Sequence, residues 1–257
     1  MKIFKDIYEW TTFRKSLSPD KSLGVVMTMG ALHDGHFSLI KRSKAENDYT
    51  LSTIFVNPTQ FDRKDYLDNY PVTLNSDIAG LEKLNTDFLL LPDFEQIYPD
   101  NYTYKVCESE FSKILCGASR KGHFDGVLTV VMKLLHIADA DRAYFGEKDY
   151  QQYHLIKKMA EAFFMNTEII GCDIVREKDG LAMSSRNMRL TENGRKLATF
   201  YAKAIRQNKG LEEIKVHLES NGVKVDYLEE RFGRRFAAVF IDNVRLIDNF
   251  DTKEVKI

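Results

Sequence analysis

The first 175 residues alternate between short apolar runs and segments with helical spacing. The apolar run at residues 23–29 predicts a buried strand, residues 36–47 predict a helix, and residues 51–56 predict a second strand. Strands that alternate with helices are typical of a doubly wound parallel sheet. The alternation continues with helices predicted near residues 74–84, 127–138 and 150–164, and with strands predicted at residues 88–91, 143–145 and 168–175.

The remaining residues follow a different pattern. Apolar side chains at helical spacing occupy residues 197–205 and 211–218. Three short runs rich in β-forming residues follow, at 223–228, 236–241 and 244–247. The predicted fold class is therefore α/β, with a doubly wound parallel sheet followed by a small α+β C-terminal domain.

Charge supports a boundary near residue 175. The chain has 257 residues and a net charge of −1, with 37 basic and 38 acidic side chains. Residues 176–257 contain 17 basic and 13 acidic residues, whereas residues 1–175 contain 20 and 25. We predict one domain at 1–175 and another at 176–257, and the near-neutral total argues against a nucleic-acid partner.

Two features favour a cytoplasmic location. Residues 1–10 (MKIFKDIYEW) contain acidic side chains where a signal peptide is apolar, and no run approaches the ~20 apolar residues of a membrane span. The three cysteines, Cys107, Cys116 and Cys172, form no CxxC pair, which favours reduced thiols over a metal or redox site.

The most informative loop is residues 28–36 (TMGALHDGH), between the first predicted strand and helix. Gly30 and Gly35 allow a ligand to approach the backbone closely, and a helix start offers N–H groups to an anion. His33 and His36 can donate hydrogen bonds to phosphate oxygens. The loop therefore predicts a nucleotide phosphate site, while incidental histidines, a metal pair and a core turn remain alternatives.

The common nucleotide-binding signatures are absent. Residues 117–122 have the glycine spacing of a phosphate-binding loop, but His123 and Phe124 stand where that loop requires Lys and Ser or Thr. The sequence also lacks GxGxxG, the fingerprint of dinucleotide-binding folds.

Several blocks of sequence together resemble one family, the pantothenate synthetases (pantoate–β-alanine ligases). This family belongs to the adenylyl-forming group, with class I aminoacyl-tRNA synthetases and nucleotidylyltransferases. The resemblance spans most of the chain and implies a Rossmann-like sheet. The blocks occur in order at residues 28–36, 55–61 (FVNPTQF), 122–127 (GHFDGV), 145–152 (FGEKDYQQ), 175–177 with 179–187, and 245–249.

The resemblance implies a two-step reaction. Pantoate attacks the α-phosphate of ATP and releases pyrophosphate, and β-alanine then attacks the pantoyl adenylate to give pantothenate and AMP. ATP is expected with Mg²⁺ held mainly by its own oxygens. The resemblance also implies a homodimer formed through the N-terminal domain.

The resemblance carries residue roles as well. His36 is implied as the principal catalytic histidine and proton donor, supported by His33 and by the cations Lys148 and Arg186. Gln60 and Gln152 are implied to hold pantoate, with Gln60 also on the β-alanine side and Asn57 near the phosphates or metal. The implied ATP site comprises Met29, Gly30, Ala31, Leu32, His33, Asp34, Gly35, His36, Gly146, Glu147, Lys148, Asp149, Val175, Met183, Ser184, Ser185 and Arg186.

The sequence departs from the family pattern at three places, and two other functions remain alternatives. Met27 and Lys121 replace prolines that are usual in the family, and residues 227–240 are shorter than usual. Met27 is expected to loosen the following turn. A nucleotidylyltransferase or tRNA-charging relative could use the same histidine loop, and a non-enzymatic nucleotide sensor could retain the fold.

Overall fold

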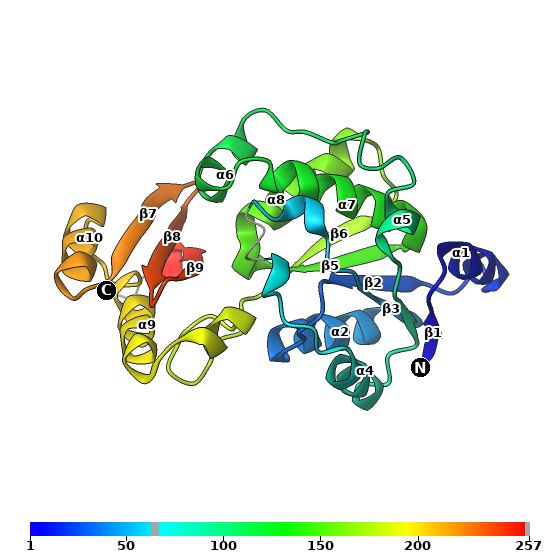
Figure 1. Cartoon of the computed structure of the whole chain (residues 1–257), viewed down its shortest axis with the longest axis horizontal. Coiled ribbons are helices and arrows are strands. Elements are labelled where there is room, and N and C mark those ends of the chain that lie inside the picture. The colour runs from blue at the N-terminus through cyan, green and yellow to red at the C-terminus, as the bar shows by residue number, and fades with distance from the viewer. Residues whose placement is uncertain (63–66, 255–257) are drawn as a thin grey trace. The chain divides into compact units, whose positions relative to one another are not determined.

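The computed structural model describes residues 1–62 and 67–254, which form two compact units (Figure 1). The N-terminal unit contains residues 1–147 and 151–172, and the C-terminal unit contains residues 148–150 and the chain from 173 onward. The predicted boundary at residue 175 lies close to this division, which falls after Cys172.

A six-stranded sheet with all neighbouring strands parallel forms the centre of the N-terminal unit. Its order is β1-β4-β3-β2-β5-β6, which confirms the predicted α/β class. The strands are β1 (Lys2–Phe4), β2 (Leu23–Thr28), β3 (Tyr49–Ile54), β4 (Phe88–Leu90), β5 (Arg142–Gly146) and β6 (Glu168–Cys172).

Helices cover both faces of this sheet, so its central strands are buried (Figure 1). Val25 in β2 and Leu51 in β3 are 0% exposed. This burial explains the apolar run at β2. The helices are α1 (Ile7–Ser16), α2 (Asp34–Glu46), α4 (Leu74–Lys83), α5 (Phe94–Ile97), α6 (Cys116–Ser119), α7 (His123–Ala138) and α8 (Tyr150–Ala162), with 3₁₀ turns η1 (Pro58–Gln60), η2 (Phe111–Lys113) and η3 (Glu147–Asp149).

The strand order reverses between β2 and β5. These neighbours pair at Gly24 with Arg142 and at Val25 with Ala143. From β2 the chain continues through α2 to β3 on one side, and from β5 it continues through α8 to β6 on the other. In doubly wound sheets, ligands bind at the carboxyl ends of the strands at such a reversal. The histidine loop follows β2 at this edge.

The structure differs from the predicted elements mainly at their ends. β1 and α1 were not predicted, because a three-residue strand is too short for a pattern. α1 packs through Trp10, whose ring centroid lies 5.3 Å from that of Phe4 and whose Nε1 donates to the carbonyl of Ile137. β3 begins and ends two residues before its predicted position, and β6 ends at Cys172 rather than at residue 175.

Met27 lies inside β2, paired with Thr53. The change from the family's usual proline therefore falls within the strand, one residue before its end, and not in the turn. Its effect is on the strand, because a proline would lack the backbone N–H that Met27 has.

The C-terminal unit is α+β, as predicted. Its antiparallel sheet has the order β7-β8-β9, and the β7–β8 hairpin turns at Phe232 and Gly233, whose φ values are 55° and 71°. Tyr201, Leu218 and Val239 lie in a shared core and are fully buried. The elements are η4 (Ser185–Arg189), α9 (Glu192–Ala204), α10 (Leu211–Ser220), β7 (Lys224–Arg231), β8 (Arg234–Ile241), β9 (Val244–Asp251) and η5 (Thr252–Glu254).

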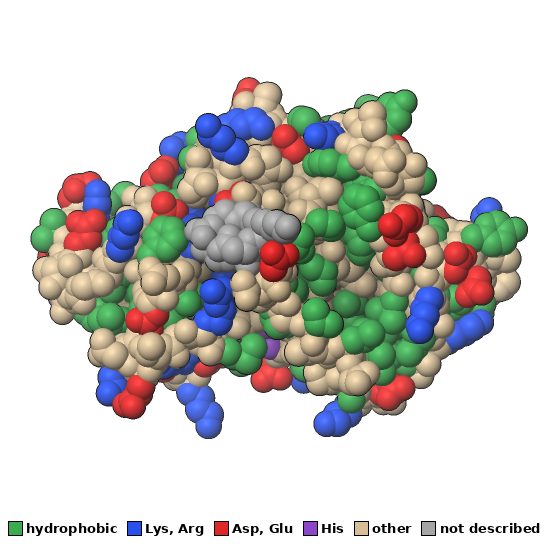
Figure 2. Space-filling view, viewed as in Figure 1, with side chains coloured by type: hydrophobic (Ala, Val, Ile, Leu, Met, Phe, Trp, Pro, Cys, Tyr) green, Lys and Arg blue, Asp and Glu red, His purple; other side chains and the backbone are tan. Residues whose placement is uncertain are grey.

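The surface has charges of both signs. Figure 2 shows basic and acidic side chains interspersed on the viewed face of each unit. Within residues 1–62 and 67–254, no helix has both the length and the apolar character needed to cross a bilayer.

Candidate functional site

Two histidines form the N-terminal cap of α2. Nδ1 of His33 accepts a hydrogen bond from the amide of Gly35 at 3.1 Å, and Nδ1 of His36 accepts from the amide of His33 at 3.4 Å. This is the reciprocal geometry of a capping box, with imidazoles in place of the usual hydroxyl and carboxylate. Because both Nδ1 atoms accept, the neutral rings carry their proton on Nε2. Each ring thus has an N–H donor on the edge opposite the backbone.

The amides of this loop are mostly engaged by the protein itself. The sequence predicted that the helix start offers N–H groups to an anion, and this prediction was wrong for the amides of His33 and Gly35, which donate to the two imidazoles. In all, five amides of the loop donate to acceptors within the protein. Their acceptors are the Thr28 hydroxyl, the Asp77 carboxylate and the two imidazoles. The five amides belong to Gly30, Ala31, Leu32, His33 and Gly35.

Asp77 on α4 holds the loop that precedes the histidines. Its carboxylate is 3% exposed and accepts from the amides of Ala31 at 3.0 Å and Leu32 at 2.8 Å, and from the hydroxyl of Thr73 at 3.1 Å. Gly30 has φ +81°, and a Cβ there would stand 3.1 Å from Asp77 Oδ2. The backbone conformation and the close approach to Asp77 therefore both require glycine at this position.

Asn57 organises the turn after β3. Its side chain is 1% exposed, and Oδ1 accepts from the hydroxyls of Thr59 at 3.0 Å and Tyr98 at 2.9 Å. Burial raises the pKa of Tyr98 to about 12, so this hydroxyl stays protonated and can donate. Nδ2 of Asn57 donates to Oε1 of Gln60 at 3.0 Å and to the carbonyl of Gly126 at 3.3 Å.

Gln60 is brought next to the histidine loop. Because its Oε1 accepts from Asn57, its Nε2 is directed to the other side, where it lies 3.2 Å from Sδ of Met29. A thioether is only a weak acceptor. The amide N–H₂ of Gln60 is thus held beside a residue of the predicted phosphate loop, in contact with an acceptor that a ligand oxygen could outcompete.

The adjacent glutamines on α8 differ in environment. Gln151 is 5% exposed, accepts from the amide of Cys116, and donates to the carbonyls of Phe111 and Ile114. It therefore stabilises the connection around η2 and α6. Gln152, the predicted pantoate ligand, is half-buried on the next position of the helix.

In the C-terminal unit, Asn249 holds the backbone of Lys148. Nδ2 of Asn249 donates to the Lys148 carbonyl at 2.9 Å, and Asn249 is 2% exposed on β9. The ammonium of Lys148 lies 3.6 Å from Oδ2 of Asp149. The side chain of Lys148 is 18% exposed and that of Asp149 is 48% exposed. The backbone at Lys148 is therefore anchored to the sheet.

The predicted nucleotide loop at residues 175–186 is bound to Asp248, the residue before Asn249 in β9. The guanidinium of Arg176 pairs with both oxygens of Asp248, at 2.7 and 2.8 Å, and the Asp248 side chain is fully buried. The amide of Met183 donates to the carbonyl of Val175 at 3.0 Å. Asp248 and Asn249 thus fix the start of this loop and the backbone of Lys148.

The end of this loop forms η4. The hydroxyl of Ser184 accepts from the amide of Arg186 at 3.3 Å and caps the turn. Asn187 donates from Nδ2 to Oε1 of Glu177 at 2.7 Å. Ser184, Ser185 and Arg186 are half-buried.

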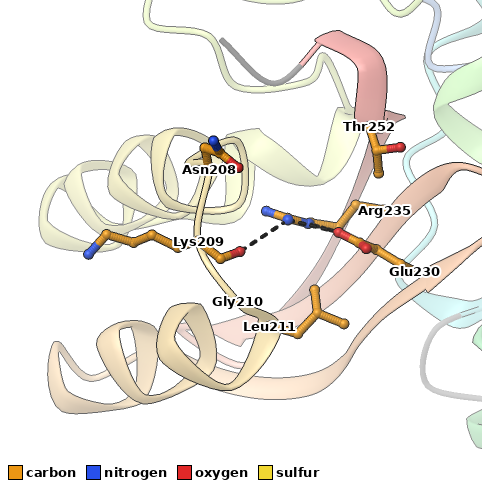
Figure 3. Close-up of a pocket in the computed structure, with 7 residues that line it drawn as sticks. All are labelled: Asn208, Lys209, Gly210, Leu211, Glu230, Arg235 and Thr252. Carbon is orange, nitrogen blue, oxygen red and sulfur yellow. Dashed lines mark hydrogen bonds and ion pairs between the residues drawn. The ribbon is translucent and has the colours of Figure 1, made fainter. Parts of the chain in front are cut away.

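A separate cavity of about 430 Å³ lies in the C-terminal unit (Figure 3). Its buried cation, Arg235, donates to the carbonyls of Ile205, Gln207 and Lys209 and pairs with Glu230. These protein acceptors occupy the guanidinium, which joins the end of α9 to β8. The cavity contains none of the predicted site residues and is lined by Asn208, Lys209, Gly210, Leu211, Glu230, Arg235 and Thr252.

The described parts of the chain contain neither a metal-binding cluster nor a disulfide. Residues 1–62 and 67–254 contain no cluster of three or more His, Cys, Asp or Glu side chains arranged to hold a metal. The three cysteines, all within these ranges, are thiols without a disulfide.

Several structural partners of the site were not predicted from the sequence. Asp77 and Tyr98 lie 45 and 41 residues from Leu32 and Asn57, the residues they contact. Asp248 and Asn249 belong to a block that resembles the family, but no local pattern indicated which residues they hold.

The fold and the histidine loop define an α/β nucleotide-binding protein with its site at the carboxyl ends of parallel strands. The family model for pantoate–β-alanine ligase matches residues 2–251. A pantothenate synthetase of Legionella pneumophila (strain Lens) is 52% identical over 250 residues, covering 97% of this chain and 99% of that protein. One from Coxiella burnetii (strain Dugway 5J108-111) is 49% identical over 248 residues, covering 96% of each chain.

A solved structure gives the same result. The pantoate–β-alanine ligase of Francisella tularensis, complexed with β-γ ATP and β-alanine, superposes with a TM-score of 0.94 at 44% identity and 98% coverage of both chains. The pantothenate synthetase of Thermus thermophilus superposes with a TM-score of 0.88 at 33% identity, covering 98% of this chain and 99% of that one.

The chain belongs to the pantoate–β-alanine ligase family. Its activity is the ATP-dependent condensation of pantoate with β-alanine. The predicted family, fold class and enzyme activity are thereby confirmed.

Proposed function

We propose that the chain forms pantothenate through a pantoyl adenylate. A pantoate carboxylate oxygen bonds to the α-phosphorus of ATP as the bond to the β-phosphate bridging oxygen breaks, and pyrophosphate leaves. The neutral amine nitrogen of β-alanine then bonds to the acyl carbon, the bond from that carbon to the AMP oxygen breaks, and the nitrogen loses one proton to water. The capping box of His33 and His36 is the main support, because it gives the loop two Nε2–H donors on the ring edges opposite the backbone, while Gln60 contacts Met29 of the same loop.

We assign the charge stabilisation in the first step to His33 and His36. Pantoate is already ionised at neutral pH, so this step needs donors toward the α-phosphate and leaving group rather than a base. The outward Nε2–H of each ring suits this role, with His36 as principal donor. Lys148 and Arg186 would add positive charge for the phosphates.

The other nucleotide contacts follow the order of the motifs. Residues 29–36 would approach the phosphates, and their rigid backbone, held by Asp77, supports this role. Gly146, Glu147 and Asp149 would line the nucleoside, and the carboxylate of Asp149 would accept a hydrogen bond from a ribose hydroxyl. Val175 and Met183 would contact adenine through their backbone, while Ser184 and Ser185 would donate hydroxyls to the triphosphate.

Pantoate would be held by Gln60 and Gln152, neutral side chains that donate without neutralising the nucleophilic carboxylate. Gln60 would also contact β-alanine. Asn57 has protein partners for both ends of its amide, which supports a role in orienting Gln60 over direct ligand contact.

Mg²⁺, assembly and location complete the proposal. Mg²⁺ binds phosphate oxygens readily and would arrive with ATP as part of the substrate. We also propose a homodimer formed through the N-terminal unit, because the family resemblance implies one. We propose a cytoplasmic location, which is consistent with three cysteines that form no disulfide. Residues 1–175 would bind ATP and pantoate, and residues 176–257 would contribute the Ser-Ser-Arg loop.

The overall reaction is tested by product stoichiometry. Purified protein with ATP, Mg²⁺, pantoate and β-alanine should yield equal amounts of pantothenate, AMP and pyrophosphate, measured by mass spectrometry. Omitting either pantoate or β-alanine should abolish pantothenate. ADP as the nucleotide product, or equal condensation when an α-amino acid replaces pantoate, would exclude this function.

A further inference from the structure

We propose that His123 is a positioning residue that fixes Gln60 for substrate binding, which rests on the role proposed for Gln60 above. His123 begins α7 and is 7% exposed. Its Nδ1 lies 2.8 Å from the backbone carbonyl oxygen of Gln60, 63 residues earlier in the chain. This distance lies within the usual range of an N–H···O hydrogen bond.

The partners of His123 determine which nitrogen carries the proton. Nη1 of Arg120 lies 2.8 Å from Nε2 of His123. A guanidinium only donates and a carbonyl only accepts, so Nε2 is the acceptor and Nδ1–H is the donor. The neutral ring therefore connects Arg120 to the Gln60 carbonyl.

Arg120 is itself anchored close to Gln60. Its Nε lies 3.5 Å from Oδ1 of Asp62, and its Nη2 donates to the Gln60 carbonyl at 3.4 Å. The Gln60 carbonyl thus has two donors, of which His123 is the nearer. The segment from Gln60 to Asp62 is held by Arg120, which caps the end of α6, and by His123, which begins α7.

Gly126, on the first turn of the same helix, brings η1 into direct backbone contact. A Cβ at Gly126 would stand 2.5 Å from the carbonyl oxygen of Thr59 and 2.7 Å from the amide nitrogen of Gln60. The Gly126 carbonyl also accepts from Asn57. Helix α7 therefore sets the position of the Gln60 backbone, and Asn57 sets the rotation of its amide.

These contacts define what Gln60 presents to a ligand. With its Oε1 committed to Asn57, Gln60 presents its N–H₂ group and selects an acceptor such as the carboxylate or a hydroxyl of pantoate. Loss of the hydrogen bond from His123 would leave the backbone turn at Gln60 less restrained. The affinity for pantoate and β-alanine would then fall. The KM for ATP would change little.

The test compares replacements that keep or remove the Nδ1 donor. In His123→Asn the amide N–H₂ stands near the position of Nδ1, whereas His123→Leu has no donor, and His123→Gln places its amide near Nε2 instead. Val127→Ala is the matched control, because Val127 is 2% exposed on the same helix. The KM values for pantoate, β-alanine and ATP are measured for each variant, with thermal unfolding and with pantoate binding by calorimetry in the presence of a non-hydrolysable ATP analogue.

His123→Leu should raise the KM and Kd for pantoate about tenfold and change the KM for ATP less than about twofold, as expected for loss of one partly buried hydrogen bond. His123→Asn should restore most of the loss, and Val127→Ala should lower stability alone. If His123→Leu does not fold, His123→Gln takes its place in the comparison. Equal effects on ATP and pantoate, or an Asn variant no better than the donor-free variant, would overturn the proposal.

A double variant separates this proposal from the one it rests on. If Gln60→Ala leaves the pantoate KM unchanged, the role of Gln60 is wrong. If Gln60→Ala raises it, His123→Leu should add little in the double variant, because both changes remove one interaction. Additive effects would show that His123 does not act through Gln60.

Discussion

The imidazole rings of His33 and His36 lie with their centroids 4.2 Å apart and their planes inclined by 40°. Each uses Nδ1 to accept an amide of the helix start, so each neutral ring has its N–H on Nε2. One pair of side chains thereby caps α2 and carries two donors on a fixed backbone. The structural role and the proposed chemical role therefore fall on the same two residues.

Replacement of His36 separates these two roles. Asn at position 36 can keep the amide acceptor, whereas Gln can keep a donor near Nε2. His36→Ala should lower kcat by about 10²–10³-fold, the usual loss for a donor aimed at developing charge. Steady-state kinetics should rank Gln above Asn in kcat, and thermal unfolding should rank Asn above Gln in stability.

A control histidine makes the comparison specific. His136 is exposed near the end of α7, and His136→Ala should leave kcat unchanged. The same kcat for His36→Ala and the wild type would contradict the role of the Nε2 donor.

Asp77 should stabilise both the fold and the histidine loop. Asp77→Ala leaves the amides of Ala31 and Leu32 without their acceptor, which should cost about 1–3 kcal/mol of unfolding free energy. It should also lower kcat, because the histidines follow this segment directly. Urea unfolding and steady-state kinetics check both effects.

Glu82 provides the comparison for Asp77, since it is an exposed acid on the same helix. Glu82→Gln should change neither stability nor kcat by more than a surface substitution does. Wild-type activity in a folded Asp77→Ala protein would show that the histidine loop does not need this anchor.

Asn249 should act through the backbone of Lys148. Asn249→Asp keeps an oxygen that accepts from Arg234 but loses the N–H₂ group that donates to the backbone carbonyl of Lys148. We expect the KM for ATP to rise about tenfold, as for loss of one partly buried hydrogen bond, with the KM for β-alanine unchanged. Asn221→Ala, at an exposed helix end, is the control. A uniform rise in all KM values would indicate general damage to the unit.

The carboxylate of Asp100 should make the folding stability depend on pH in the acid range. A hydrogen bond from Lys133 lowers the pKa of Asp100 from 3.8 to about 2. A carboxylate with a lowered folded-state pKa stabilises the fold above its unfolded pKa, and this stability is lost as pH falls through the folded value. Asp100→Asn should therefore be less stable than wild type at pH 7, and the difference should shrink between about pH 4 and about pH 2.

Thermal unfolding across this pH range measures the effect. Asp20→Asn, at an exposed position, serves as its control and should track the wild type. A difference between Asp100→Asn and the wild type that stays constant down to about pH 2 would contradict the assigned contribution of Lys133.

The sequence predicts the central strands well because both of their faces are buried. β2 reads as a mostly apolar run, β3 combines apolar residues with Ser and with Thr, which suits a strand, and the helix after β2 follows from its spacing. α2 nevertheless begins at Asp34, two residues earlier than predicted, because histidine is an unusual cap and carries no standard signal. β1 is three residues long and gains its stability from pairing with β4, which a local pattern does not reveal.

The partners of the site residues are harder to predict for a related reason. Histidine and glutamine motifs are local, but their supports come from distant parts of the chain. Gln60 and His123 are 63 residues apart, and Lys148 and Asn249 are 101 apart. Only folding brings these groups together, since each pairing depends on which strands and helices become neighbours. The sequence therefore predicts which side chains carry the chemistry better than it predicts what holds them.

The most direct test is isotope exchange between pyrophosphate and ATP in the absence of β-alanine. If a pantoyl adenylate forms with the help of the histidine pair, the wild type should catalyse exchange only when pantoate is present, and His36→Ala should lose at least about 99% of that rate. Exchange without pantoate, no exchange until β-alanine is added, or full exchange by His36→Ala would contradict the two-step reaction at this site.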